Sequence, residues 1–188
     1  MKRIAKRGLP QTTLTSGTWT LALGKVRLVR PSRSRLLHVD EEWARLRVSP
    51  VRASVGHWRW TAIARTGETF GVVDAADSLR TLALWASGGV WEDGAQRLYE
   101  VAWIETNPVL SGLLIGCLSL IVARAVEVGC TGLLIPSLPE TERIWRGIGA
   151  VPPHVAPLRI AHGLVPLVLR GATMDALREI ADEARDQA

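Results

Sequence analysis

The second half of the chain carries a continuous series of apolar elements around which the fold must be built. Residues 97–105 (RLYEVAWIE) are rich in β-forming side chains and apolar on both alternating faces, which predicts a strand covered on both sides. A long helical pattern over 112–128 follows and ends at Gly129, a common left-handed stop. A short buried strand at 131–136 and a short helix at 139–147 complete the series. The order predicts an α+β (mixed α/β) fold.

The N-terminal part predicts a strand region followed by a helix. Residues 18–29 (TWTLALGKVRLV) are typical of one or two strands interrupted at Gly24 and Lys25. Pro31 and Ser32 then offer a helix start. The helix is indicated by a loosely helical set of apolar side chains, namely Leu36, Leu37, Val39, Trp43 and Leu46.

The middle of the chain predicts a hairpin and a second helix. Residues 57–64 and 69–74 are typical of two strands joined by a turn at 66–68. Residues 77–87 are expected to form a helix that ends at the glycine pair 88–89.

The remaining sequence completes one domain. Residues 158–160 and 164–169 predict a final strand pair, and residues 173–188 predict a terminal amphipathic helix. The chain has 188 residues, of which 47% are hydrophobic and 22% charged, a balance typical of globular proteins and not of disordered ones. We therefore expect a single domain over residues 16–188, preceded by a basic arm at residues 1–15.

Positive charge is concentrated at the N-terminal end. Residues 1–50 hold 11 Lys and Arg against 3 Asp and Glu, a net charge of +8, whereas residues 51–188 hold 12 against 15, a net charge of −3. An Arg-rich segment can contact the phosphates of nucleic acid, and it can equally be a solvated flank. Both interpretations stay open at this point.

Several patterns exclude other classes of protein. The fifteen uncharged residues 109–123 are fewer than the roughly 20 that span a bilayer, so we expect a buried helix and no membrane segment. No apolar stretch follows the charged start as an export signal requires. Cys117 and Cys130 lack Cys-x-x-Cys spacing, which predicts unreactive core thiols. Free core thiols suit a reducing compartment, so we expect a cytoplasmic protein. The four histidines lack metal-ligand spacing, so we expect no metal.

Residues 97–150 (RLYEVAWIETNPVLSGLLIGCLSLIVARAVEVGCTGLLIPSLPETERIWRGIGA) resemble the core of the GNAT superfamily of N-acetyltransferases. In that superfamily a strand leads into a Gly-rich turn and a long helix, and then into a second strand and a short helix with an aromatic residue four positions before a Gly. Trp145 and Gly149 stand at the last two positions. The resemblance implies a twisted, mostly antiparallel sheet flanked by helices and split between the strands at 98–104 and 131–135. Acetyl-CoA or another acyl-CoA would lie in that split.

The turn before the long helix is the expected diphosphate site, because the first turn of a helix offers backbone N–H groups and a positive dipole end. In the family it contains Arg or Gln, Gly, x, Gly, x, and Gly or Ala. Gly112 and Gly116 match this pattern, whereas Ser111 and Leu114 depart from it. The resemblance implies cofactor contacts from Ser111, Gly112, Leu114, Ile115, Gly116 and Cys117. Close helix packing at Gly-x-x-x-Gly is the alternative.

Glu105 is the candidate catalytic residue. It ends the predicted strand where, by resemblance, many GNAT enzymes place the general base, and a carboxylate can accept the proton that an amine loses on acyl transfer. A capping or surface Glu is the alternative. Backbone N–H groups near Trp103, Ile104 and Glu105 would polarise the thioester carbonyl. Glu100 lies deeper in the strand and is the less favoured base.

Two further residues are expected to contact the pantetheine arm, Ser137 and Trp145. Trp145 stands where the family commonly has a tyrosine that protonates the leaving thiolate, and an indole N–H cannot supply that proton. Core packing is the alternative for Trp145. Trp58 and Trp60 would share one strand face as an acceptor wall, a dimer contact or part of the core.

The sequence thus predicts an N-acetyltransferase that transfers an acetyl group from a CoA thioester to an amine of unknown identity. A catalytically silent GNAT-like binding module is the alternative, with a possible contact to nucleic acid or tRNA through the Arg-rich N-terminal part. A homodimer is compatible with either.

Overall fold

The computed structural model describes residues 6–7, 18–21, 24–46, 59–65, 67–86, 90–93, 96–107, 114–154, 160 and 163–186. Its strands are β1 (Lys6–Arg7), β2 (Thr18–Leu21), β3 (Gly24–Val29), β4 (Gly67–Asp74), β5 (Leu79–Ala86), β6 (Val90–Asp93), β7 (Gln96–Glu100), β8 (Trp103–Thr106), β9 (Gly132–Ser137) and β10 (Val165–Arg170). Its helices are α1 (Arg33–Leu46), α3 (Trp60–Ile63), α4 (Leu114–Glu127), α5 (Glu142–Gly147) and α6 (Ala172–Asp186), with a 3₁₀ turn at Pro139–Thr141.

The described strands form two sheets. The first sheet has the order β1-β6-β7-β9-β10, and the second has the order β2-β3-β4-β5-β8. Neighbouring strands are antiparallel, except that β7 and β9 run parallel. Because parallel strands need a long crossover, helix α4 lies between β8 and β9 in the chain. This is the mostly antiparallel, helix-flanked and divided sheet that the resemblance implied.

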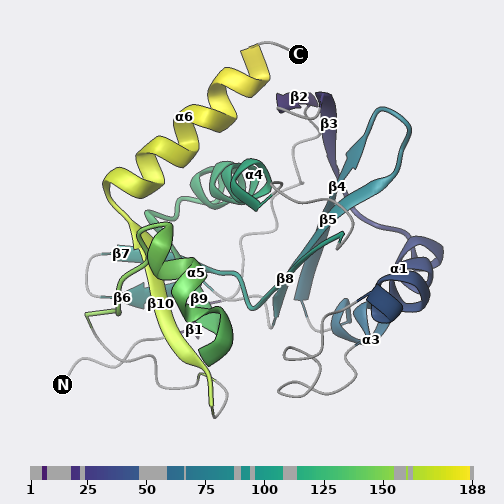
Figure 1. Cartoon of the computed structure of the whole chain (residues 1–188). Coiled ribbons are helices and arrows are strands. Elements are labelled where there is room, and N and C mark those ends of the chain that lie inside the picture. The colour runs from purple at the N-terminus through teal and green to yellow at the C-terminus, as the bar shows by residue number, and fades with distance from the viewer. Residues whose placement is uncertain are drawn as a thin grey trace.

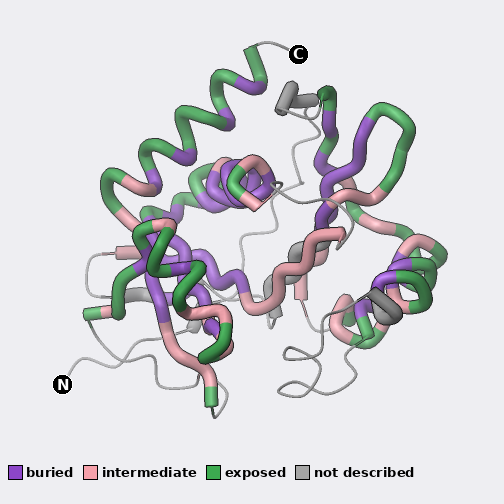
Figure 2. The backbone as a smooth tube through the Cα atoms, in the orientation of Figure 1, coloured by how far each residue is buried: buried purple, intermediate pink, exposed green. Residues whose placement is uncertain are grey.

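Helices α4 and α6 lie side by side and share one core with the two sheets (Figure 1). Figure 2 shows α4 buried over most of its circumference and α6 buried along one stripe only. The stripe of α6 consists of Met174, Leu177, Ala181 and Ala184, spaced as one face of a helix. The main core also takes side chains from both sheets, among them Phe70, Val72, Tyr99, Leu133 and Leu167. Burying each large apolar side chain contributes about 1.5–3 kcal/mol to the free energy of unfolding.

A second apolar cluster covers the opposite face of the second sheet, beneath α1 and α3 (Figure 1). We call it the tryptophan cluster. It is formed by Leu36, Val39, Trp43 and Trp60, with Ile63, Ala64, Leu79 and Trp103 packed against it. The second sheet is therefore covered on both faces, by α4 on one and by α1 with α3 on the other.

At two positions the structure explains why the residue is glycine. Gly129 has φ +74°, a left-handed conformation that favours glycine, and it ends α4 as the sequence predicted. Gly132 opens β9 where three strands meet closely. A Cβ atom there would lie 2.8 Å from Leu98 Cδ2 and 2.9 Å from the Leu169 carbonyl oxygen. Glycine at this position lets β7, β9 and β10 pack together.

Most predicted elements are confirmed. The strand region at 18–29 contains β2 and β3, and the helix expected after Pro31 is α1. Of its apolar set, Leu36, Val39 and Trp43 are buried, whereas Leu37 is exposed. The later helices and the strand at 131–136 appear as α4, α5, α6 and β9. Lys6 and Arg7, within the predicted basic arm, pair with β6, and the domain boundary at residue 15 stays a prediction.

The helix predicted over 77–87 is wrong, because this segment contains strand β5. The strand pairs with β4 on one side and β8 on the other, so tertiary pairing overrides the local helical pattern. Asp77, the first residue of the expected helix, instead has φ +64° in the turn between β4 and β5. Gly88 and Gly89 lie outside the described residues.

The hairpin predicted from residues 57–64 and 69–74 is also wrong. Residues 60–63 form the short helix α3, and the hairpin partner of β4 is β5. Trp60 is therefore on a helix and not on a strand face, and Trp58 lies outside the described residues. Of the predicted final strand pair, the second strand is β10, which pairs with β9 along its whole length. Residues 158 and 159 of the first strand lie outside the described residues, and Ile160 is not in a strand.

Candidate active site

The segment predicted as one strand over 97–105 is divided between the two sheets. Its first part is β7, which pairs with β9 up to Glu100 opposite Leu134. The Val101 N–H still donates to the Leu134 carbonyl oxygen (2.8 Å), and then the chain leaves β9 and forms β8 beside β5. Strand β9 continues to Ser137 along β10 (Figure 1). The predicted split between two central strands thus opens after Val101.

The pairing of β8 fixes which of its backbone groups face the split. The Asn107 N–H donates to the Arg80 carbonyl oxygen (3.0 Å), so these two residues form a hydrogen-bonded antiparallel pair. Because such pairs alternate along the strands, Trp103 and Glu105 direct their backbone groups toward β5. Ile104 directs its N–H and C=O to the opposite edge of β8, from which β9 has separated.

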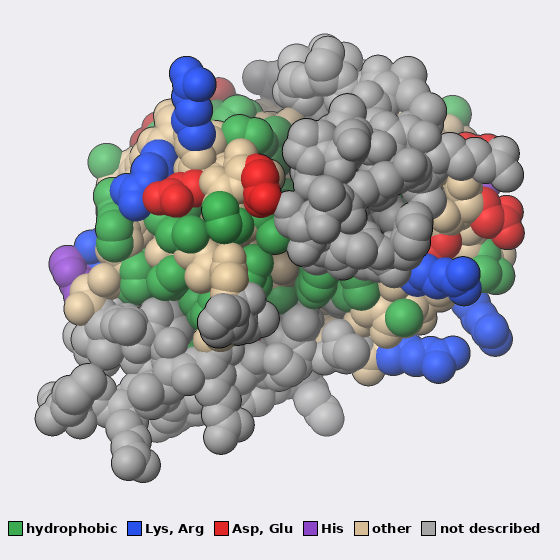
Figure 3. Space-filling view, turned by 60° about the horizontal axis from the view of Figure 1, so that its bottom comes forward, with side chains coloured by type: hydrophobic (Ala, Val, Ile, Leu, Met, Phe, Trp, Pro, Cys, Tyr) green, Lys and Arg blue, Asp and Glu red, His purple; other side chains and the backbone are tan. Residues whose placement is uncertain are grey.

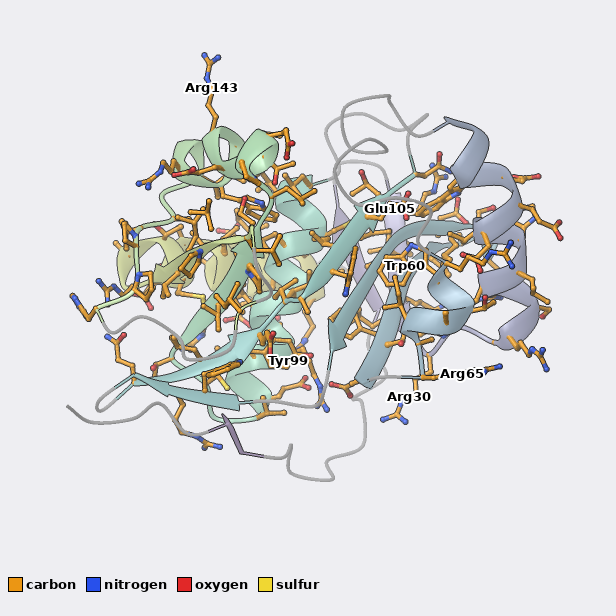
Figure 4. All side chains as sticks on the ribbon, turned by 90° about the horizontal axis from the view of Figure 1, so that it is seen from below. Arg30, Trp60, Arg65, Tyr99, Glu105 and Arg143 are labelled. Atoms are coloured by element: carbon orange, nitrogen blue, oxygen red, sulfur yellow. The ribbon has the colours of Figure 1, made fainter. Side chains whose placement is uncertain are left out.

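Side chains of β8 alternate between the two covered faces of the second sheet. Ile104 packs against the main core, on the side of α4. Trp103 packs against the tryptophan cluster, and Glu105 accepts a hydrogen bond from Trp60 Nε1 (2.5 Å) on that same side. Figure 4 shows Trp60 and Glu105 on the half of the molecule that carries α1 and α3. The predicted base therefore lies on the face opposite to α4.

A carboxylate of α1 holds the helix that carries Trp60. Asp40 accepts hydrogen bonds from the Trp60 N–H (2.5 Å), the Thr61 N–H (3.1 Å) and the Thr61 hydroxyl (2.6 Å). The amide groups at a helix start have no intrahelical partner, and a side-chain carboxylate satisfies them well. Here the carboxylate comes from another helix, so α1 and α3 are joined at the site.

The first turn of α4 carries the predicted diphosphate contacts. Leu114 packs against the main core, whereas Ile115 is exposed on the surface. The Cys117 side chain is fully buried and accepts a hydrogen bond from the Thr81 hydroxyl (2.7 Å), so only its main chain is left for the predicted contact. Ser111 and Gly112 lie outside the described residues. A helix beginning here directs backbone N–H groups toward its N-terminal end.

The two residues expected at the pantetheine arm are buried. Ser137 ends β9, and its hydroxyl donates to the Leu138 carbonyl oxygen (2.8 Å) and lies 3.1 Å from the Thr141 hydroxyl. Trp145 is 6% exposed and belongs to the main core, which fits its core-packing alternative. Glu100 is buried on the first sheet and accepts a hydrogen bond from Trp91 Nε1 (2.8 Å), consistent with the deep position expected for it.

Sequence reasoning missed Asp40 and the role of Trp60. Asp40 is 20 residues before α3, and Trp60 is 45 residues before Glu105, so no local motif joins them. The one available signal was the presence of eight tryptophans against a single Tyr and a single Phe.

Other site classes find no support in the part of the chain that the structure describes. No group of three or more His, Cys, Asp or Glu side chains there is arranged to hold a metal ion. Among the same residues, no helix has both the length and the apolar character needed to cross a bilayer.

Comparison with known proteins rests on structure alone, since no family model and no curated protein sequence matches. The chain is similar to an acetyltransferase of the GNAT family from Listeria monocytogenes, with 12% identity, 81% of this chain and 99% of that chain covered, and a TM-score of 0.57. It is also similar to Mycobacterium smegmatis RimJ in complex with CoA-disulfide, with 11% identity, 90% and 94% coverage and a TM-score of 0.53.

A third similar structure is a spermidine N-acetyltransferase SpeG chimera from Vibrio cholerae and hSSAT, with 12% identity, 81% and 97% coverage and a TM-score of 0.52. At sequence identities this low, the structural similarity establishes the fold alone. The divided sheet, the crossover helix α4 and these similarities agree that the chain has the fold of the GNAT N-acetyltransferases.

Proposed function

We propose that this protein is an acyl-CoA-dependent N-acetyltransferase that uses acetyl-CoA or a related acyl-CoA and acts in the cytoplasm. The observation that carries the proposal is the departure of β8 from β9 after Val101. A strand edge offers a row of N–H and C=O groups, and an extended ligand can bind to it as an added strand. The pantetheine arm, which carries two amides, is such a ligand.

The diphosphate of CoA would lie at the N-terminal end of α4. That helix follows β8 after a short connection, so it begins close to the split. Ser111 and Gly112 in the connection, together with the main chain of residues 114–117, would donate hydrogen bonds to the phosphate oxygens. Leu114 packs against the main core, and therefore its presence in place of a glycine does not itself fill the split.

The reaction would use the two sides of β8 separately. On the split edge, the Ile104 N–H would donate to the thioester carbonyl oxygen and stabilise the negative charge that develops there. On the face of α1 and α3, the Glu105 carboxylate would take a proton from the acceptor amine. The C–N bond forms as the C–S bond breaks, and the CoA thiolate takes its proton from water. We assign no residue to that last step, because Trp145 is buried and its indole is not an acid.

Ser137 ends β9 at the split and would contact the arm. Its hydroxyl already donates within the Ser137 to Thr141 turn, so the contact would come from its main chain. Trp145 would support the site from the core without touching the arm.

Calorimetry with acetyl-CoA and with CoA tests binding, and release of free CoA thiol across a panel of amines tests transfer. We expect binding in the micromolar range or tighter, and Glu105→Gln should lower turnover at least tenfold while leaving binding of CoA within about twofold. Glu142→Gln, which changes an exposed carboxylate on α5, is the matched control and should alter neither quantity. Absence of both heat and thermal shift at millimolar acetyl-CoA would refute the proposal.

A catalytically silent binding module is the second candidate. It is favoured by Trp145 at the position of the usual tyrosine, buried in the core, and by Leu114 in the diphosphate turn. CoA binding without turnover on any amine would support it.

A nucleic-acid contact through the Arg-rich part stays a prediction. Figure 4 shows Arg30 and Arg65 near the same end of the second sheet, and Figure 3 shows Lys and Arg side chains projecting at the edge of this half of the molecule. Binding that weakens steeply with added salt would support it, because phosphate contacts release counterions. A homodimer also stays a prediction, which sedimentation analysis checks.

A further inference from the structure

Trp60 joins two carboxylates from different elements. Its main-chain N–H donates to Asp40 on α1, and its indole Nε1 donates to Oε2 of Glu105 on β8, each across 2.5 Å. The Trp60 side chain is fully buried in the tryptophan cluster, so the indole has no freedom to choose another partner. The donor and both acceptors are thus held in one arrangement.

Helix α3 depends on Asp40 for its position. It has only four residues, far fewer than a helix needs to persist by itself in water. Arg59 at its N-cap makes no side-chain capping bond, and the two amide groups of its first turn are instead satisfied by Asp40. Loss of this carboxylate would free the first turn of α3, and the indole would move with it.

The indole in turn fixes the orientation of Glu105. An indole N–H only donates, so Oε2 of Glu105 is the acceptor of this bond. A hydrogen bond to a charged oxygen is about twice as strong as a neutral one. The bond therefore holds the Glu105 carboxylate in one orientation.

We propose that Trp60 and Asp40 are positioning residues for Glu105, an inference that rests on the proposed function. Asp40 holds α3, α3 holds the indole of Trp60, and the indole holds the Glu105 carboxylate in one orientation. Neither residue takes part in the proton transfer itself.

Two carboxylates are bonded to Trp60, namely Asp40 at its main-chain N–H and Glu105 at its indole. Arg59 and Arg65, on either side of α3, are exposed, and Figure 4 shows Arg65 directed outward. Arg80 on β5 is engaged with Asp74.

The direct test compares the indole N–H resonances of the ¹⁵N-labelled protein and its variants by NMR. Trp60→Phe identifies the resonance of Trp60. Glu105→Gln, which replaces the charged acceptor of this N–H, should shift that resonance. An indole resonance that ignores Glu105→Gln would overturn the proposal. This readout needs no acceptor, so failure of the acetyltransferase assignment leaves it intact.

The second measurement separates the effect on kcat from the effect on KM. Trp60→Phe keeps an aromatic ring but removes the donor, so kcat should fall about tenfold while KM for the acyl-CoA stays within about twofold. Asp40→Asn, which perturbs the support of α3 without changing the Trp60 side chain, should lower kcat by less. A variant that only unfolds at a lower temperature, with kcat unchanged, would show a merely structural role.

Trp91→Phe is the matched control. Trp91 is also buried and also donates its indole N–H to a glutamate, Glu100, but on the first sheet. It should leave kcat and the Trp60 resonance unchanged. If it shifts both as Trp60→Phe does, the effect is not specific to Glu105 and the proposal fails. Should Trp60→Phe not fold, Asp40→Asn with Glu105→Gln decides the question.

Discussion

Arg124 on α4 donates from Nη2 to Oε1 of Glu68 on β4 across 3.0 Å, and their side chains are 2% and 8% exposed. The Tyr99 hydroxyl on β7 donates to the other oxygen of Glu68 (3.2 Å). Glu68 therefore joins α4 and the first sheet to the second sheet. Glu68→Gln leaves the Arg124 charge buried, and we expect a loss of about 3 kcal/mol in the free energy of unfolding, measured with urea. This is the low end for such changes, since Glu127 still faces Arg124.

An exposed ion pair supplies the comparison. Arg146 and Glu142 on α5 are 2.6 Å apart, with side chains 47% and 29% exposed. Glu142→Gln should cost less than about 1 kcal/mol, because water screens the pair. If both substitutions lower the free energy of unfolding by the same amount, burial does not account for the contribution of the Glu68 ion pair.

Tyr99 offers a pH prediction, because it is the single tyrosine of the chain. Burial, followed by the nearby charge of Glu68, raises the pKa of its hydroxyl well above 10. A raised pKa in the folded state means that its contribution to stability is full below about pH 10 and is lost as the pH rises further. Tyrosinate absorbance should therefore appear in the folded protein only above pH 10, together with unfolding, and at about pH 10 in denaturant.

Tyr99→Phe is the control for that titration and should abolish the absorbance change in both conditions. A folded protein that ionises Tyr99 near pH 10 without unfolding would contradict the buried position described for it.

The segment 97–105 shows which part of the fold can be predicted from sequence and which part cannot. Residues 97–105 were predicted as a strand because both faces are apolar, and both faces are indeed covered. The break at Val101 and Ala102 leaves no trace in that pattern, because it depends on the different partners of the two parts, β9 for one and β5 for the other. Segment 77–87 failed for the same reason, since its strand state is imposed by its neighbours.

The candidate site likewise has a part that the sequence predicts and a part that depends on tertiary packing. Glu105 and Ile104 could be singled out from their position on a predicted strand, and the strand alternation then sorts their roles. The Asp40 to Trp60 to Glu105 series could not be predicted, because it joins residues 20 and 45 positions apart through a helix that the sequence favoured as a strand. Contacts of this kind become visible only once the elements are packed.

The two cysteines should be inert in the native protein. Both are buried and free of a disulfide. Burial raises the pKa of Cys117, and burial raises the pKa of Cys130 to about 11. Since the thiolate is the reactive form, we expect no rapid reaction with an aromatic disulfide reagent at pH 8 and two reacting thiols in denaturant. Rapid modification of a thiol in the folded protein would contradict this.

Gly132→Ala tests the close packing at the base of the split. Its Cβ would lie 2.8 Å from Leu98 Cδ2, which can turn aside, and 2.9 Å from the Leu169 carbonyl oxygen, which is fixed by pairing within the first sheet. We expect a loss of about 1–3 kcal/mol in the free energy of unfolding, because overpacking must move a strand. Gly147→Ala is the matched control, since no atom lies within 4 Å of its added Cβ and alanine favours the helix α5. It should be neutral or stabilising by up to about 1 kcal/mol, and an equal loss in both variants would mean that contact with Leu169 does not determine the effect.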